Sequence, residues 1–225
     1  MNVLDLFSGI GGFSLGLEWA GFRTLAFCES NVDCATTLAR RWPGTPVFGD
    51  IRSLKIERGF ADLVVGGFPC QPFSTAARGR NNAEGLWPEF LRIVREGRPR
   101  WVVAENVPGI GHEGIERVCR NLENQGYIVW AFDLDAALPQ RQRGRHRVVW
   151  VAHTNRKSES RRPKHEEVAG LPPLSVLRIT NDPSPVVLDD GVSERMEQLR
   201  QLGNAFPPTA AYLIGRAILR ADTCQ

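Results

Sequence analysis

Short apolar runs alternate with helix-like segments along the first half of the chain, and this alternation constrains the fold more than any other feature. The runs are rich in branched and aromatic residues, which is typical of strands buried on both faces of a parallel sheet. They cover residues 3–7, 24–28, 46–48, 61–65 and 101–104. Helical periodicity covers residues 13–20, 32–41 and 86–95. We therefore predict an α/β fold with a doubly wound, mostly parallel sheet and helices on both faces.

Size and composition agree with one globular domain. The chain has 225 residues, of which 42% are hydrophobic, so it can bury a substantial core. It shows no basic leader and no apolar stretch near the roughly 18 residues that span a bilayer, so we expect a soluble cytoplasmic protein with no membrane partner. Five cysteines without Cys-x-x-Cys spacing predict reduced thiols and no metal site.

Three successive strand ends carry residues suited to a nucleoside-containing ligand. Residues 8–12 read Ser-Gly-Ile-Gly-Gly, and such a loop ahead of a helix lets the backbone approach a ligand closely. The glycine spacing matches neither the dinucleotide fingerprint nor a P-loop. Glu29 and Asp50 follow the next two runs, where carboxylates can accept from ribose hydroxyls and an adenine amino group. We predict an adenosyl cofactor pocket; the alternative for each acid is a solvated surface carboxylate.

Two further strand ends carry candidate catalytic groups. Residues 66–74 place Cys70 between glycines and prolines, which favours a fixed backbone path that exposes the thiol as a nucleophile. The alternative is a small buried hydrophobe in a turn. Glu105 follows the fifth run, where a carboxylate is costly unless it is paired or used, so we predict a proton donor. The alternative is a helix cap ahead of Val107.

The order and spacing of these motifs resemble the DNA (cytosine-5) methyltransferases, which use S-adenosylmethionine. The motifs are Asp5 to Gly12, Pro69-Cys70-Gln71, Glu105-Asn106-Val107, the strand Val148 to Val151, and Leu202 to Pro208. The resemblance covers residues 2–153 and about 190–219. It implies the Rossmann-like S-adenosylmethionine-dependent methyltransferase fold, with the final helix, at residues 209–220, beside the first. It also implies a compact restriction-modification type of enzyme from a prokaryote or a virus of one, acting in the bacterial cytoplasm.

The resemblance implies the roles of individual residues as well. The Cys70 thiolate would add to carbon 6 of cytosine while Glu105 engages ring N3, and the target base must leave the duplex for the thiol to reach it. The family's arginine motif falls at residues 140–147, which are richer in arginine than the motif requires. Anchoring on the strand that follows assigns Arg145 and Arg147 to the two catalytic arginines and leaves Arg143 where glutamine is expected. No metal is implied.

For the cofactor, the resemblance implies a set of contacts from successive loops. Phe7, Ser8, Gly9, Ile10 and Gly12 would line the methionine and adenine portions, Glu29 and Ser30 the ribose, Asp50 and Ile51 the adenine, with Pro69, Leu86, Asn204 and Ala205 closing the pocket.

The chain departs from the family where a target-recognition domain is expected. Only residues 154–190 are available there, so we expect a catalytic core at 1–153, a short basic and proline-rich insert at 154–190, and a returning segment at 191–225. Between residues 139 and 164 nine Lys or Arg face one acid, which suits the phosphate backbone of double-stranded DNA. Base-specific contacts would come from the insert, from the polar segment 75–84, or from a partner, either a helper chain or a second copy.

Two other functions stay open at this point. The chain could be a DNA-binding or regulatory protein that keeps the cofactor pocket and methylates weakly or only with a partner. It could also methylate RNA, as one branch of the family does, although that branch carries a Cys-Phe-Thr signature that residues 154–190 lack.

Overall fold

A seven-stranded sheet forms the centre of the computed structural model, which describes residues 1–69, 85–135, 146–154 and 205–223. The strand order is β3-β2-β1-β4-β5-β7-β6. The strands are β1 (Asn2–Leu6), β2 (Arg23–Cys28), β3 (Val47–Phe48), β4 (Leu63–Gly67), β5 (Trp101–Asn106), β6 (Ile128–Asp135) and β7 (His146–His153). Neighbours among β1 to β5 pair in parallel, whereas β7 runs antiparallel to both β5 and β6. This is the doubly wound, mostly parallel sheet that the sequence predicts.

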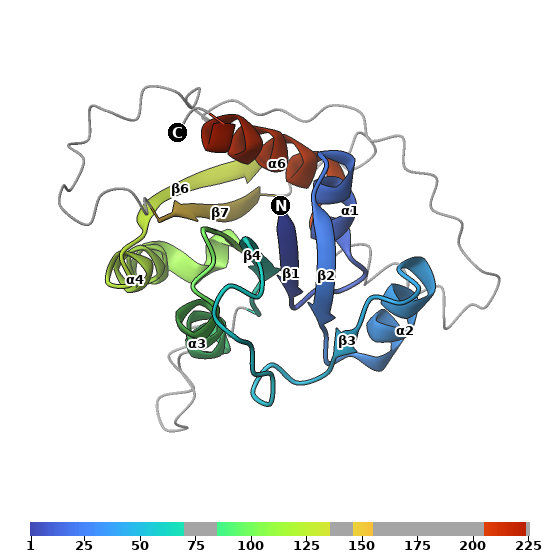
Figure 1. The fold of residues 1–225 in the computed structure, drawn as a ribbon. Helices are drawn as coiled ribbons and strands as arrows, with labels where there is room; N and C mark the ends of the chain where they lie inside the picture. Colours follow the sequence, from blue (N-terminus) through green and yellow to red (C-terminus); the bar gives the residue numbers. More distant parts are fainter. Residues whose placement is uncertain (70–84, 136–145, 155–204, 224–225) are drawn as a thin grey trace, which may run out of the picture.

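Helices cover both faces of the sheet (Figure 1). They are α1 (Gly12–Trp19), α2 (Val32–Arg41), α3 (Trp87–Gly97), α4 (Gly111–Glu123) and α6 (Pro208–Thr223), with a 3-10 turn η2 (Pro108–Ile110) before α4. One core lies between the sheet and α1 with α6, and the other lies under α3 and α4. Alternation along β1 sends Val3 into the first core and Leu4 and Leu6 into the second, as a strand buried on both faces requires.

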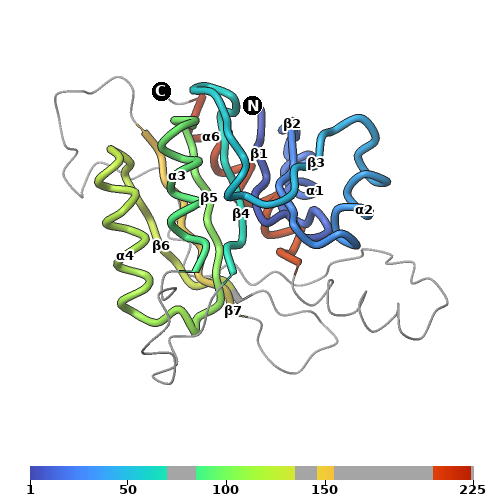
Figure 2. The backbone as a smooth tube through the Cα atoms, turned by 90° about the horizontal axis from the view of Figure 1, so that it is seen from below, coloured from blue at the N-terminus to red at the C-terminus, as the bar shows by residue number. Residues whose placement is uncertain are grey.

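The helices α3 and α4, which pack on the same face of the sheet, also bond to each other. The indole Nε1 of Trp87 in α3 donates to the Asn121 amide oxygen in α4 at 2.9 Å. Figure 2 shows α3 and α4 side by side along the strands. Trp87 also lies near the rings of Phe68 and Phe90, with centroids 5.0 and 5.3 Å away. This aromatic group holds the start of α3 against the segment that follows β4.

The first and last helices of the described chain pack directly on each other, which confirms the neighbourhood that the family resemblance implies. Contact is close because α1 presents glycines: a Cβ on Gly12 would overlap the Phe206 carbonyl, and one on Gly16 the Pro208 carbonyl. The rings of Phe13 and Phe206 stack with centroids 3.9 Å apart. The segment from residue 205 onward is therefore an integral layer of the core.

The structure corrects several predicted boundaries. The fourth strand covers Leu63–Gly67, so Gly66 and Gly67 belong to the strand and not to the loop that the sequence predicted. Glycine suits these positions because a Cβ on Gly66 would overlap the Leu6 carbonyl of β1. The helix α4 and the edge strand β6 were not predicted at all. Among the described residues, no helix is long and apolar enough to cross a membrane.

Candidate active site

The carboxyl ends of β1 to β5 meet at one edge of the sheet, because these strands are parallel. The antiparallel strand β7 begins at that same edge, since its Val148 pairs with the last residue of β5, Asn106. Phe7 to Gly12, Glu29 with Ser30, and Asp50 with Ile51 follow β1, β2 and β3, whereas Glu105 lies at the end of β5 and Arg147 at the start of β7. The edge thus gathers the predicted cofactor contacts that follow β1, β2 and β3, together with Glu105 of β5 and Arg147 of β7.

The loop after β1 is a tight turn with an unusual backbone. Phe7, Gly9 and Gly11 all have positive φ, at 52°, 53° and 87°. The Gly11 N–H donates to the Ser8 carbonyl at 2.8 Å, and the Ser8 hydroxyl donates to the Asp5 carbonyl at 2.7 Å. A Cβ built on Gly9 would meet no atom within 4 Å. The Ser8 and Gly11 hydrogen bonds fix the turn, and the side of Gly9 on which a Cβ would lie is open, so a ligand can approach the backbone there.

Glu29 joins this glycine loop to the end of β2. One carboxylate oxygen accepts from the Gly9 N–H at 2.7 Å, and the other accepts from the Asn31 N–H at 2.7 Å. A carboxylate has about four acceptor positions, so each oxygen keeps capacity for a further donor such as a ribose hydroxyl. Ser30 is exposed beside it. Glu29 therefore bridges the glycine loop and the end of β2. This role does not favour a purely solvated surface carboxylate, and it leaves contact with a ligand open.

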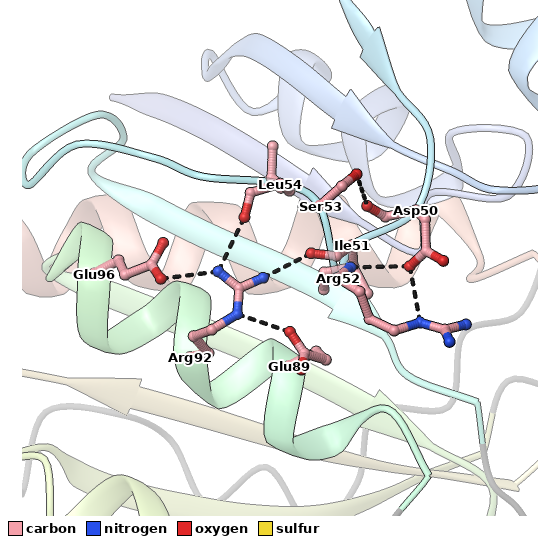
Figure 3. A network of polar contacts seen from close by, with 8 residues as sticks. All are labelled: Asp50, Ile51, Arg52, Ser53, Leu54, Glu89, Arg92 and Glu96. Atoms are coloured by element: carbon pink, nitrogen blue, oxygen red, sulfur yellow. Dashed lines mark hydrogen bonds and ion pairs between the residues drawn. The ribbon is translucent and has the colours of Figure 1, made fainter.

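The turn after β3 carries Asp50 and Ile51 (Figure 3). The Asp50 carboxylate is about half exposed and accepts from the backbone N–H of Arg52 at 2.9 Å, which lowers the pKa of that carboxyl. Ile51 is only 3% exposed, and its side chain belongs to the core. Asp50 therefore presents a charged acceptor at the sheet edge, whereas Ile51 can offer a ligand its backbone but little of its side chain.

Glu105 lies at the end of β5 against Arg147 of β7. The Arg147 Nε and a Glu105 carboxylate oxygen are 2.8 Å apart, and the two side chains are 14% and 12% exposed. In such a sheltered site a charge-assisted hydrogen bond fixes the carboxylate firmly. The alternative, that Glu105 caps a helix, is wrong: the residue lies within β5, and neither η2 nor α4 has a side-chain cap.

Glu105 also lies next to the strand that leads to Cys70. Gly67 pairs with Glu105 in the sheet, and a Cβ on Gly67 would lie 2.5 Å from a Glu105 carboxylate oxygen. The Asn106 side-chain amide donates to the Phe68 carbonyl at 3.0 Å, and its oxygen accepts from the Val107 N–H at 2.8 Å. Asn106 therefore locks the backbone two residues before Cys70 to the end of β5. Sequence reasoning missed this role, although a buried asparagine after an apolar strand could have indicated it.

The remaining predicted residues fall at the same edge or outside the described chain. Phe7 and Leu86 pack partly buried against the core, Ile10 is buried, Pro69 is exposed, and Ala205 lies three residues before α6. Cys70, Arg145 and Asn204 lie outside the described residues, as do the segment 75–84 and most of the insert 154–190. Within the described ranges, no group of three or more His, Cys, Asp or Glu is arranged to hold a metal ion.

Asp5 is a buried acid that the sequence analysis did not single out beyond its motif. It is fully buried within β1 directly under the glycine loop, and one oxygen accepts from the Ser14 hydroxyl of α1 at 2.7 Å. The other oxygen has no hydrogen-bond partner in the described part of the chain. Burial, reinforced by the charge of Glu29, raises the pKa of the Asp5 carboxyl to about 7. Asp5 links β1 to α1 at the cost of holding an acid away from water.

This raised pKa predicts how Asp5→Asn changes stability with pH. The folded protein binds the Asp5 proton more tightly than the unfolded chain, so wild-type stability falls as pH rises from about 4 to about 7. The variant lacks that term, so between pH 5 and pH 8 its stability relative to wild type should rise by on the order of 3 kcal/mol. Any pH-independent cost of the buried amide cancels in the comparison. Urea unfolding of both proteins at pH 5 and pH 8 measures this; a constant difference would contradict the prediction.

Comparison with known proteins identifies relatives across this region. The family model described as C-5 cytosine-specific DNA methylase matches residues 1–181. The Type II methyltransferase M.AquIA of Picosynechococcus is 41% identical over 122 residues, which are 48% of this chain and 49% of that protein. The Type II methyltransferase M2.BsuMI of Bacillus subtilis is 35% identical over 168 residues, which are 68% of this chain and 42% of that protein. The chain thus spans about half the length of these curated relatives or less.

Solved structures give the same picture. A prophage-encoded DNA modification methyltransferase of Escherichia coli superposes with a TM-score of 0.58 at 32% identity, covering 68% of this chain and 47% of that one. The Dnmt2 methyltransferase of S. pombe superposes with a TM-score of 0.54 at 21% identity, covering 71% of this chain and 50% of its own. The second likeness concerns the fold alone. Together these findings confirm the Rossmann-like methyltransferase fold.

Proposed function

Because this chain belongs to the C-5 cytosine-specific DNA methylase family, we propose that it transfers a methyl group from S-adenosylmethionine to carbon 5 of cytosine in double-stranded DNA. The observation that carries the proposal is the Glu105–Arg147 pair beside the strand that leads to Cys70. A sheltered carboxylate, oriented by a guanidinium and lying beside the strand that precedes a candidate thiol nucleophile in the sequence, suits addition to a pyrimidine ring.

The chemistry assigns a separate task to each group. The Cys70 thiolate forms a bond to carbon 6 of the flipped cytosine, and Glu105 holds a proton at ring N3, so carbon 5 becomes nucleophilic. S-adenosylmethionine supplies the methyl group as an electrophilic sulfonium. After carbon 5 has gained the methyl group, its proton passes to a water molecule, the electrons of that C–H bond restore the double bond between carbons 5 and 6, and the Cys70 thiolate leaves carbon 6. Arg147 keeps the Glu105 carboxylate in place, and we assign Arg145 to the same catalytic arginine pair.

The described residues fit this cofactor. The open space above Gly9 lets the backbone of the glycine loop approach the methionine portion, and Phe7, Ser8, Ile10 and Gly12 form the same loop. Glu29 keeps free acceptor capacity for the ribose, with Ser30 exposed beside it. The half-exposed Asp50 offers a charged acceptor for the adenine amino group, and the Ile51 backbone follows. We assign Pro69, Leu86, Asn204 and Ala205 to the closing side of the pocket.

We propose that phosphate contacts come from the basic segment between residues 139 and 164 and that the insert 154–190 takes the place of a target-recognition domain. In this division residues 1–153 are the catalytic core and residues 191–225 return to it. A helper chain or a second copy supplies base recognition if the insert alone does not. The relatives are bacterial Type II methyltransferases, which supports restriction-modification in a bacterial cytoplasm as the setting.

Trapping with duplex DNA that contains 5-fluorocytosine tests the proposal. A fluorine at carbon 5 cannot leave as a proton does, so the enzyme stalls while Cys70 is still bonded to carbon 6. We expect an adduct between protein and DNA that survives denaturation and forms only when S-adenosylmethionine is present. Absence of the adduct over DNA of mixed sequence, despite measurable S-adenosylmethionine binding, would contradict methylation by this chain alone.

The two other functions are less well supported. The curated relatives are named as methyltransferases, which does not favour a regulatory protein without catalysis. The Dnmt2 likeness is at 21% identity and carries only the fold, so it does not argue for RNA as the substrate. Methylation of duplex DNA and of transfer RNA, measured in parallel, separates the DNA from the RNA substrate.

A further inference from the structure

Arg92 makes a set of contacts that neither the sequence motifs nor the proposed chemistry uses. It lies in the middle of α3, and its side chain is about one quarter exposed. The guanidinium donates to two backbone carbonyls of the turn after β3, from Nη2 to Ile51 at 2.7 Å and from Nη1 to Leu54 at 2.9 Å. Figure 3 shows the side chain reaching from α3 to this turn. Arg92 therefore joins a helix to the loop that carries Asp50.

Two acids of α3 hold the guanidinium in its orientation. Glu89 accepts from Arg92 Nε at 2.7 Å, and Glu96 accepts from Nη1 at 2.8 Å. They lie one turn before and one turn after Arg92 on the same face of the helix. Nε and Nη1 of the guanidinium bond to these acids of α3, which turns the donors on Nη1 and Nη2 toward the carbonyls of the turn. This use of both sides of a planar fork is available to arginine and not to lysine.

The turn is held by its own contacts as well: Arg52 donates to one Asp50 carboxylate oxygen from its backbone N–H at 2.9 Å and from its Nε at 3.1 Å. The Ser53 N–H donates to the Asp50 carbonyl at 3.0 Å and the Leu54 N–H to the Ile51 carbonyl at 3.1 Å, so residues 50–54 form one compact unit. Ile51 and Leu54 anchor that unit in the core. Asp50 points away from the core and is about half exposed. Arg92 adds a bond to the Ile51 carbonyl, next to Asp50, and so restricts the backbone from which the Asp50 carboxylate and its Arg52 partner extend.

We propose that Arg92 is a positioning residue for the adenine end of the cofactor site, acting through the 50–54 turn on Asp50. The inference rests on the proposed function for the identity of the cofactor. Arg92 touches neither the cofactor nor the reacting atoms; it restricts the turn so that the Asp50 acceptor is already in place before binding, which lowers the ordering cost of the complex.

Arg92→Met should raise the Kd for S-adenosylmethionine roughly tenfold, the range expected from loss of charge-assisted hydrogen bonds that order a binding loop. The KM for the cofactor should rise in parallel, while kcat at saturating cofactor stays within about twofold, because the reacting groups are untouched. Arg92→Lys should give an intermediate Kd, since an ammonium restores the charge but not the fork. Arg95→Met is the matched control, because Arg95 is exposed on the same helix and should bind the cofactor like wild type.

A double-mutant cycle separates positioning from general destabilisation. If Arg92 acts through Asp50, Arg92→Met should weaken binding much less in an Asp50→Ala background than in wild type. Calorimetric titration of S-adenosylmethionine into the four proteins measures the cycle without any DNA. Equal effects in both backgrounds, or unchanged affinity in Arg92→Met, would overturn the inference. Failure of the wild type to bind the cofactor would instead overturn the proposed function, so the two outcomes are distinguishable.

Discussion

Cys70→Ala should lose methyl transfer to DNA almost completely while it keeps its affinity for S-adenosylmethionine within a few-fold. Removal of a covalent nucleophile can cost on the order of a millionfold in kcat, because the remaining groups cannot form the covalent intermediate that makes carbon 5 reactive. The proposed cofactor contacts come mainly from the ends of β1, β2 and β3, whereas Cys70 follows β4, so binding should survive. Transfer of a labelled methyl group to duplex DNA gives the first quantity and calorimetric titration the second.

Cys119→Ser provides the matched control for the loss of a thiol. Cys119 lies in α4, is half-buried, and packs against the core between α4 and the sheet. We expect this variant to methylate DNA at close to the wild-type rate. Full activity of Cys70→Ala would remove the cysteine from the mechanism. Loss of cofactor binding in Cys70→Ala would instead assign the cysteine a structural role.

Gly16→Ala should destabilise the fold even though alanine is the better helix former. In an exposed helix the exchange would stabilise by about 1 kcal/mol. Here the new Cβ would overlap the Pro208 carbonyl and lie 2.7 Å from the Ala211 Cβ. The carbonyl belongs to the backbone at the start of α6, so it cannot turn aside as a side chain can. We expect a loss of about 2–3 kcal/mol, typical of overpacking, and a thermal midpoint lower by roughly 5–10 °C.

Gly109→Ala is the control for this prediction. A Cβ on Gly109 would meet only the Val107 side chain at 3.8 Å, which is an ordinary contact. Thermal unfolding followed by circular dichroism compares both variants with wild type. If Gly16→Ala unfolds at the wild-type temperature, the close packing of α1 on α6 does not contribute as we describe.

The sequence predicted the parallel strands and the residues at their ends because those signals are local. An apolar run followed by Gly9, Glu29 or Asp50 can be recognised without knowing its neighbours. The register of the arginine motif was ambiguous for the opposite reason. Several arginines precede the last strand, and only its pairing with β5 places Arg147 against Glu105.

Residues that act on distant backbone escaped prediction. Arg92 lies on an amphipathic helix, where an arginine normally faces solvent, and its partners are carbonyls about 40 positions earlier that carry no side-chain signature. Asn106 acts in the same way on Phe68. The strand β6 was missed although its first five residues, Ile128 to Phe132, form a continuous apolar run like those that marked the central strands, so in this case the local signal was present and was not used.

The packing of α6 on α1 has a consequence for folding while the chain is being synthesised on the ribosome. Gly12 and Phe206 touch in the finished fold but are separated by nearly two hundred positions of chain. At roughly 5–20 residues per second, the first helix emerges about 10–40 seconds before the segment that covers it. During that interval Phe13 and Leu17 lack their partners on α6. Nascent chains therefore expose the apolar side of α1 for a time. Chaperone binding to the N-terminal half should end when α6 packs on α1.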